Sequence, residues 1–264
     1  MEEIISSNKN DKIKYLKKLY KSSKRKKEGK FILEGYRLIK QAYESGATID
    51  YIFVNPSFKK SKEYQTFIFN KGLTGFTYLI EDKLLKDVAD TVNPQGIVAI
   101  VSEIDYKLSS IIENGKKIVV LDRIQDPGNM GTIIRTAAAA GMDGVISLKG
   151  SVDIYNLKVL RATAGAIFNI PFINKLSYDK FSELLSNKLR KYQLICTSLD
   201  TENYYHNVNY NENNILIIGN EANGIRKNLL KNADLTVKIP LNNSIESINA
   251  AMAAGLLMYK IQYD

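Results

Sequence analysis

Three segments in the second half of the chain place polar residues and glycine directly after apolar runs. They are residues 122–141 (DRIQDPGNMGTIIRTAAAAG), 216–225 (LIIGNEANGI) and 239–260 (IPLNNSIESINAAMAAGLLMYK). Amides, carboxylates, hydroxyls and a guanidinium are groups that bind ligands or move protons, and glycine lets a ligand approach the backbone closely. These segments are therefore the candidates for a chemical site.

The first segment predicts a turn followed by a helix that ends at Gly141, with Asn129 as its N-cap. Arg135 falls inside this helix among alanines and isoleucines. Two interpretations are open: the guanidinium extends to solvent, or it takes part in a functional site. Burying a guanidinium without partners is costly.

The other two segments also allow two interpretations. Glu221 lies between Gly219 and Gly224, which favours a tight turn open to a ligand. Ser247 and Asn249 precede an alanine-rich helix, where such residues either cap the helix or contact a ligand.

Composition excludes several other chemistries. With one cysteine, Cys196, and one histidine, His206, the chain lacks the ligands of a Cys/His zinc site, so we expect no metal. His206 lies in a polar segment typical of a surface loop, which argues against a Ser-His-Asp system. We expect no membrane association and a cytoplasmic protein, since no run approaches the roughly 20 apolar residues of a membrane span.

The elements that must position these segments form a regular pattern. Apolar strands are expected within residues 116–122, 143–148, 192–199, 213–220 and 235–241, separated by helical stretches. This alternation predicts an α/β domain with a parallel sheet covered by helices on both faces, whose ligands bind beyond the carboxyl ends of the strands. Shorter elements predict a small α/β domain over residues 1–101, with a linker at 102–115 before a catalytic domain at 116–264.

Positive charge is concentrated near the start of the chain. Residues 1–40 hold thirteen Lys and Arg against five Asp and Glu, whereas the formal net charge of the whole chain is +9. Such a block indicates a polyanionic partner, although a solvated lysine-rich helix is an equally open interpretation.

Together, and in this order, the three segments closely resemble the signature motifs of the SpoU, or TrmH-like, branch of the SPOUT RNA methyltransferases. The matching residues are Asn129, Gly131 and residues 133–137, then 219–221 and Gly224, then Ile239, Pro240, Ser247 and Asn249, with Ile248 in place of Leu. Arg161 and residues 165–171 match a further family feature. The resemblance spans residues 116–263, and the N-terminal part resembles the ribosomal-protein-like substrate-binding domain of such enzymes.

The resemblance implies a deep trefoil knot and S-adenosylmethionine as cofactor. It assigns to cofactor binding Thr197, Ser198, Leu199, Gly219, Asn220, Gly224, Ile239, Pro240, Leu241, Ser247 and Ile248. It assigns to RNA binding Lys24, Arg25, Lys26, Lys27, Lys30 and Arg161. Where the family often has Gly, this chain has Ala222 and Asn243.

The resemblance also implies that a ribose 2'-hydroxyl attacks an activated methyl group, with Arg135 as base or as stabiliser of the developing alkoxide. A guanidinium is essentially always protonated, which favours the stabilising role. We expect Glu221 to orient Arg135, and Ser247, Asn249 and Asn129 to complete the catalytic set.

The expected substrate is 23S ribosomal RNA, with transfer RNA as the alternative, and the expected assembly is a homodimer through the catalytic domain. Methylation of a base instead of a ribose is a rival within the superfamily. A catalytically silent RNA-binding or ribosome-assembly protein is a rival from another class.

Overall fold

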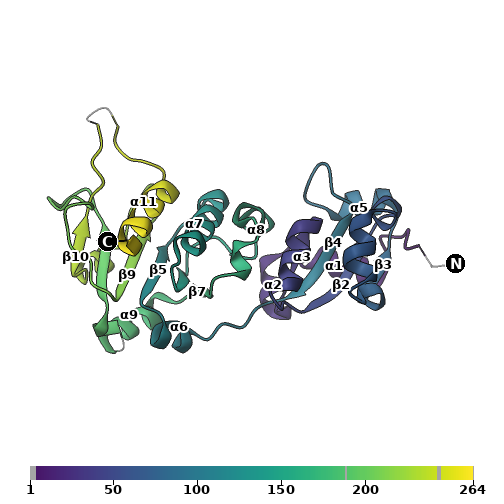
Figure 1. Cartoon of the computed structure of the whole chain (residues 1–264), viewed down its shortest axis with the longest axis horizontal. Helices are drawn as coiled ribbons and strands as arrows, with labels where there is room; N and C mark the ends of the chain where they lie inside the picture. Colours follow the sequence, from purple (N-terminus) through teal and green to yellow (C-terminus); the bar gives the residue numbers. More distant parts are fainter. Residues whose placement is uncertain (1–3, 188, 243–244, 264) are drawn as a thin grey trace. The chain divides into compact units, whose positions relative to one another are not determined.

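The computed structural model describes residues 4–187, 189–242 and 245–263, and the chain divides into two compact units (Figure 1). Unit 1 comprises the residues up to Asp105 together with Tyr155–Arg161, and unit 2 comprises Tyr106–Ile154 and the residues from Ala162 onward. No helix in the described part of the chain is long and apolar enough to cross a membrane.

Unit 1 is a four-stranded sheet with helices on its faces. Its elements are α1 (Asp11–Lys18), α2 (Ser22–Glu28), β1 (Lys30–Glu34), α3 (Tyr36–Glu44), β2 (Ile49–Val54), α4 (Pro56–Lys59), the π-helix η1 (Tyr64–Phe69), the 3-10 helix η2 (Leu73–Phe76), β3 (Thr77–Leu79), α5 (Asp82–Val88) and β4 (Ile97–Ser102). The strand order is β1-β4-β2-β3, with β4 antiparallel to both of its neighbours. Apolar residues of α1 and α5, including Leu16 and Leu85, pack on one face of the sheet.

Unit 2 is the parallel α/β sheet that the sequence pattern predicts. Its elements are α6 (Leu108–Asn114), β5 (Lys117–Asp122), α7 (Pro127–Ala140), β6 (Gly144–Leu148), η3 (Ala166–Phe168), β7 (Phe172–Leu176), α9 (Tyr178–Asn187), η4 (Leu189–Lys191), β8 (Gln193–Thr197), β9 (Asn214–Gly219), α10 (Lys227–Lys231), β10 (Leu235–Val237) and α11 (Ala250–Tyr263), while α8 (Leu157–Thr163) extends from unit 1 into it. The six strands run in the order β10-β8-β9-β5-β6-β7, and every pairing is parallel.

Both faces of this sheet are covered. Ile118 and Val120 of β5 join a core with residues of α6, α9 and α10, while α7 and α11 lie side by side over the other face (Figure 1). Val119 and Leu121, which alternate with them, are equally buried. Burial on both faces explains why these strands read as continuous apolar runs. The edge strand β7 was not anticipated, because its half-buried sequence FINKL carries no such run.

A short stretch within the second half of the chain packs into unit 1. The Tyr155 ring stacks on that of Phe31 at 4.4 Å between centroids, and Leu157 joins the core under α1 and α5. Arg161 places its guanidinium 2.8 Å from the Asp90 carboxylate and 3.9 Å from that of Glu34. The guanidinium is held by two carboxylates of its own unit, and RNA binding by Arg161 stays a prediction.

Arg25, also expected to bind RNA, makes hydrogen bonds inside unit 1. It is only 6% exposed, and its Nη1 donates 2.9 Å hydrogen bonds to the carbonyls of Leu19 and Tyr20, just past the end of α1. Helix ends leave such carbonyls without intrahelical donors, so a buried cation there stabilises the fold. Lys24, Lys26 and Lys27 on the same helix are exposed, whereas Lys30 is partly buried and forms an ion pair with Asp50.

We predict that Arg25→Met lowers the free energy of unfolding by about 1.5–3 kcal/mol, because two carbonyls lose a charged donor. Urea denaturation followed by circular dichroism measures the change. The matched control is Lys24→Met at the exposed neighbouring position, which is expected to stay within about 0.5 kcal/mol of the parent. Equal stability of the two variants would contradict the structural role of Arg25.

Candidate active site

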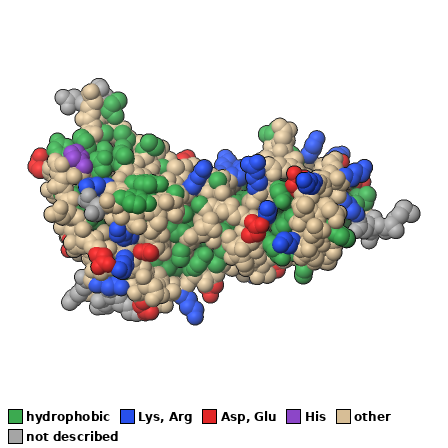
Figure 2. Space-filling model, in the orientation of Figure 1, with side chains coloured by type: hydrophobic (Ala, Val, Ile, Leu, Met, Phe, Trp, Pro, Cys, Tyr) green, Lys and Arg blue, Asp and Glu red, His purple; other side chains and the backbone are tan. Residues whose placement is uncertain are grey.

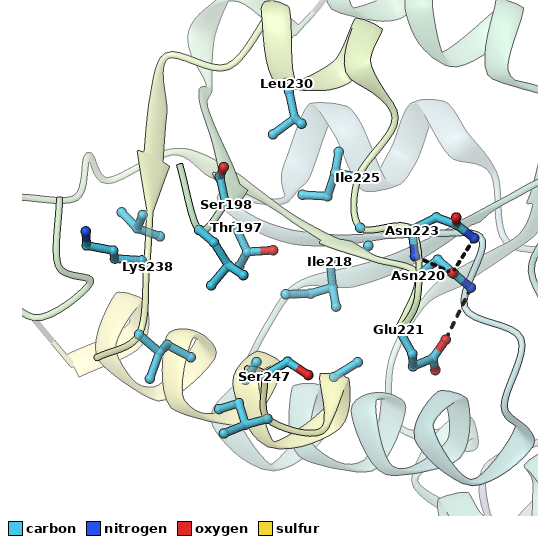
Figure 3. Close-up of a pocket in the computed structure, with 18 of the residues that line it drawn as sticks. Thr197, Ser198, Ile218, Asn220, Glu221, Asn223, Ile225, Leu230, Lys238 and Ser247 are labelled. Atoms are coloured by element: carbon cyan, nitrogen blue, oxygen red, sulfur yellow. Dashed lines mark hydrogen bonds between the residues drawn. The ribbon is translucent and has the colours of Figure 1, made fainter. Parts of the chain in front are cut away.

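A cavity of about 340 Å³ opens at the carboxyl ends of β8, β9 and β10 (Figure 3). Its walls come from the loops after these strands and from the start of α11. The lining residues are Thr197, Ser198, Leu199, Ile218, Gly219, Asn220, Glu221, Asn223, Gly224, Ile225, Leu230, Val237, Lys238, Ile239, Leu241, Ser247, Ile248, Ala250 and Ala253. The walls are mainly apolar, with Asn220, Glu221 and Asn223 together at one end, Lys238 at the opposite end and Ser247 between them (Figure 3).

The residues expected to hold a cofactor line this cavity with one exception. Pro240 is exposed and lies outside the lining, because β10 ends at Val237 and the chain continues as a loop. Asn243, noted for its departure from the family pattern, lies outside the described residues.

The turn at residues 220–224 is fixed by the side chain of Asn220, which is 8% exposed. Its Oδ1 accepts from the backbone amides of Ala222 and Asn223 at 3.1 and 2.9 Å, and the backbones of Asn220 and Gly224 exchange two hydrogen bonds. Gly224 adopts φ +60°, whereas Ala222 is not among the residues with positive φ. The turn therefore places its left-handed residue on a glycine, and alanine at 222 is not strained.

Gly219 is required by a close approach of two backbone segments. A Cβ atom at this position would lie 2.4 Å from the carbonyl carbon of Gly224 and 2.5 Å from the nitrogen of Ile225. No side chain fits there, so glycine lets the turn fold back over the end of β9.

Beneath the turn, the carboxylate of Asp122 is fully buried at the end of β5. It lies 2.6 Å from Nη1 of Arg226 and accepts the Arg226 backbone amide at 2.9 Å. Arg123 approaches the same carboxylate at 3.6 Å and donates to the carbonyl of Gly224 at 3.3 Å. These contacts hold the end of the turn against β5.

The side chain of Asn129, in segment 122–141, contacts both of the other candidate segments, 216–225 and 239–260. Its Nδ2 donates to Glu221 Oε1 at 2.7 Å, and its Oδ1 accepts from Nδ2 of Asn249 at 2.8 Å. Asn249 also caps α11, since its Oδ1 accepts from the amides of Ala251 and Met252. One amide thus joins segments 92 and 120 residues away in sequence.

The expectation that Asn129 is the N-cap of its helix is wrong. Asp126 caps α7 by accepting from the Asn129 amide at 2.7 Å, and Pro127 occupies the first helical position. Proline there needs no donor and has a preset φ, so the helix begins earlier and leaves the Asn129 side chain free to bridge the loops. The helix ends at Gly141 in a left-handed conformation, as predicted.

Arg135 lies on the exposed side of α7 and does not line the cavity. It follows Asn129 by six residues, or about 9 Å along the helix axis. Glu221 accepts a hydrogen bond from Asn129 in this structure, and the orientation of Arg135 by Glu221 stays a prediction.

The titratable groups near the cavity favour neither metal nor thiol chemistry. Among the described residues, no group of three or more His, Cys, Asp or Glu side chains could hold a metal ion. Burial raises the pKa of the Cys196 thiol to about 12, so it stays protonated at neutral pH.

Sequence reasoning missed several residues that shape the site. Asp122, Arg226 and Asn223 act on the turn, and Lys238 and Ile218 line the cavity. The only signal available for Asp122 was its position as a charged residue at the end of a buried strand.

The chain matches the family described as "SpoU rRNA Methylase family" over residues 116–259 and the "MRM3-like substrate binding domain" over residues 10–99. It is 33% identical over 258 residues to 23S rRNA (guanosine(2553)-2'-O)-methyltransferase RlmP of Bacillus subtilis, covering 98% of each chain.

Two solved structures are similar over nearly the whole chain. The AdoMet-bound rRNA methyltransferase from Sinorhizobium meliloti has a TM-score of 0.85 at 25% identity, covering 98% of this chain and 97% of that one. The SpoU methyltransferase AviRb from Streptomyces viridochromogenes, in complex with AdoMet, has a TM-score of 0.83 at 26% identity, covering 96% and 97%. Family match, relatives and fold agree, and the chain belongs to the SpoU rRNA methylase family.

Proposed function

We propose that the protein transfers a methyl group from S-adenosylmethionine to a ribose 2'-hydroxyl of RNA, with 23S ribosomal RNA as its substrate. The observation that carries this proposal is the Asn129 bridge between Glu221 and Asn249 beside a cavity at the carboxyl ends of the strands. Membership of the SpoU family and the ribosomal RNA substrate named for RlmP support it. We place the reaction in the cytoplasm and expect the family's trefoil knot, which stays a prediction.

The cavity fits the cofactor in size and chemistry. Its volume falls within the range typical of small-ligand sites. Ile218, Ile239 and Ile248 offer apolar walls to an adenine ring, and the tight turn at Gly219 exposes backbone groups to the polar parts of the molecule. When bound, S-adenosylmethionine supplies a methyl group activated by a sulfonium.

The protein's own residues then position the RNA and stabilise charge. Glu221, Asn129 and Asn249 form a hydrogen-bonded set next to Ser247, which suits the fixing of a ribose. Arg135 is exposed on α7, and its guanidinium serves as an anchor for the adjacent phosphate and for the oxyanion that forms as the hydroxyl loses its proton.

Unit 1 supplies the electrostatic grip on RNA. Lys24, Lys26 and Lys27 are exposed on α2, and Figure 2 shows Lys and Arg side chains spread over the visible face of this unit. Exposed cations can neutralise phosphates and release counterions, whereas the paired Arg25 and Arg161 cannot do so without breaking internal contacts.

We also propose that two copies associate through α11. Met252, Leu256, Tyr259 and Tyr263 are 41–73% exposed and recur at three- and four-residue intervals, which places them on one face of the helix. Such a stripe of large apolar side chains on a packed domain indicates a protein partner, and a second copy offers the same stripe by symmetry.

We predict that Arg135→Ala lowers methyl transfer at least about 100-fold, the usual cost of losing one charge-stabilising donor. Tritium transfer from labelled S-adenosylmethionine to 23S RNA measures the rate, and mass analysis of the nucleosides identifies the 2'-O-methyl product. Cofactor affinity by calorimetry is expected to change less than about twofold, because Arg135 lies outside the cavity. Thr132→Ala, exposed one turn earlier on α7, is the matched control, and retained turnover in Arg135→Ala would refute the assignment.

We predict that two changes at Asn249 separate its two contacts. Asn249→Ala removes the cap of α11 and is expected to lower the free energy of unfolding by about 0.5–2 kcal/mol. Asn249→Asp keeps the capping oxygen and the stability, yet slows methyl transfer. In this variant the carboxylates of Glu221 and of the introduced Asp both need a donor, but the Asn129 amide presents its NH2 group on one side only. One carboxylate therefore faces the Asn129 amide oxygen in either orientation of the amide, and the bridge is lost. Urea denaturation and the tritium assay provide the two readouts; full activity in Asn249→Asp would show that the bridge is dispensable.

We predict that Tyr259→Glu shifts the protein from dimer to monomer, since a charge in an apolar interface is costly to bury. Light scattering after size exclusion measures the mass in solution. Phe69→Glu, at a similarly exposed aromatic of unit 1, is the control and is expected to remain dimeric. A monomeric parent protein, or a dimeric Tyr259→Glu variant, argues against this interface.

A further inference from the structure

Three tyrosine rings form a row on unit 1, on the sheet face that α1 covers. Tyr15 comes from α1, Tyr51 from β2 and Tyr78 from β3. The centroids of Tyr15 and Tyr51 are 6.3 Å apart and those of Tyr51 and Tyr78 are 5.9 Å apart. These separations are those of rings in direct contact, and we call the three residues the tyrosine row.

The tyrosine row lies where the core of unit 1 reaches the surface. All three rings are partly buried and pack against the core that contains Ile13, Leu16 and Phe53. Phe53 lies 6.0 Å from Tyr78 and is fully buried beneath it. The rings therefore pack against the core while part of each side chain remains accessible.

Basic side chains border the tyrosine row. Lys12 Nζ lies 4.7 Å from the centroid of the Tyr78 ring, and Lys30 Nζ lies 2.6 Å from Asp50 Oδ1 on β2, next to Tyr51 in sequence. Lys26 and Lys27 are exposed on α2, which leads into Lys30. Aromatic rings together with basic side chains are the combination that binds single-stranded nucleic acid, and unit 1 carries both.

We propose that the tyrosine row stacks against unpaired bases of the RNA substrate, so that unit 1 selects looped or single-stranded RNA over continuous duplex. The proposal rests on the RNA methyltransferase function proposed above and specifies the class of RNA that this function requires. In an A-form duplex the bases are stacked on one another and their faces are closed to protein side chains. Aromatic rings can stack on bases that are no longer stacked on their neighbours.

Lys12 does not block this use of Tyr78. A base stacked on an aromatic side chain contributes more binding free energy than a cation over a ring that is partly open to solvent. We therefore expect the base to displace the Lys12 ammonium from the Tyr78 ring. The ammonium then becomes available to a phosphate of the same strand.

The absence of tryptophan from the chain allows a direct test with the full-length protein. Tyr78→Trp introduces a single indole, whose fluorescence is quenched when a base stacks on it. The probe is an unstructured RNA of about 12 nucleotides, within the site sizes of single-strand binders, compared with a fully paired duplex of the same sequence. Phe76→Trp, at a half-exposed position two residues earlier, is the matched control. We expect the single strand, and not the duplex, to quench the Tyr78→Trp variant, and neither RNA to quench the Phe76→Trp variant appreciably.

Binding of the same RNAs by Tyr78→Leu and Tyr78→Phe provides a second measurement that does not depend on the tryptophan variant. Loss of the aromatic face is expected to weaken single-strand binding about 5- to 150-fold, with Phe retaining the parent affinity, because one base stack contributes about 1–3 kcal/mol. Any of three results would overturn the proposal. The first is equal RNA affinity of Tyr78→Leu and Tyr78→Phe, and the second is an equal loss of affinity for duplex and single-stranded RNA. The third is equal fluorescence quenching of Phe76→Trp and Tyr78→Trp. Methyl transfer by the parent protein to 23S RNA is measured separately, so failure of the proposed function is distinguishable from failure of the tyrosine row.

Discussion

The candidate site depends on one side-chain amide that acts as donor and acceptor at once. Asn129, in the first turn of α7, donates to Glu221 and accepts from Asn249, which lie in the segments that follow β9 and β10. Such loops lie at the surface, where no apolar core sets their positions. Directional hydrogen bonds therefore carry out this task, and the amide suits it because its two ends have opposite polarity.

That bridge works only because the loops are anchored to a rigid sheet. Asp122, buried at the end of β5, binds the backbone and the guanidinium of Arg226, and Asn220 satisfies the amides of its own turn. A buried carboxylate is costly unless cations and amides surround it, and here they come from the segment that must be held in place. The network that satisfies the charge thus also fixes the turn beside the cavity.

Unit 1 shows how a block of positive charge divides into different roles. Arg25 binds carbonyls past the end of α1, Arg161 binds Asp90 and Glu34, and Lys30 pairs with Asp50, whereas Lys24, Lys26 and Lys27 remain exposed. Net charge is a sum over all of these groups, so it indicates a polyanionic partner without indicating which cations meet it. The role proposed for the tyrosine row depends on aromatic rings near Lys12, which charge alone could not indicate.

The sequence by itself determined the parallel sheet, five of its six strands and the loops that form the cavity, because burial on both faces requires apolar runs and ligand-binding turns require glycine next to polar residues. The family motifs determined the fold class and the cofactor. Only the tertiary structure decided that Asp126 caps α7, that Glu221 accepts a hydrogen bond from Asn129, and that Arg25 is buried. These outcomes depend on contacts between residues distant in the chain, and periodicity and composition report only on neighbours.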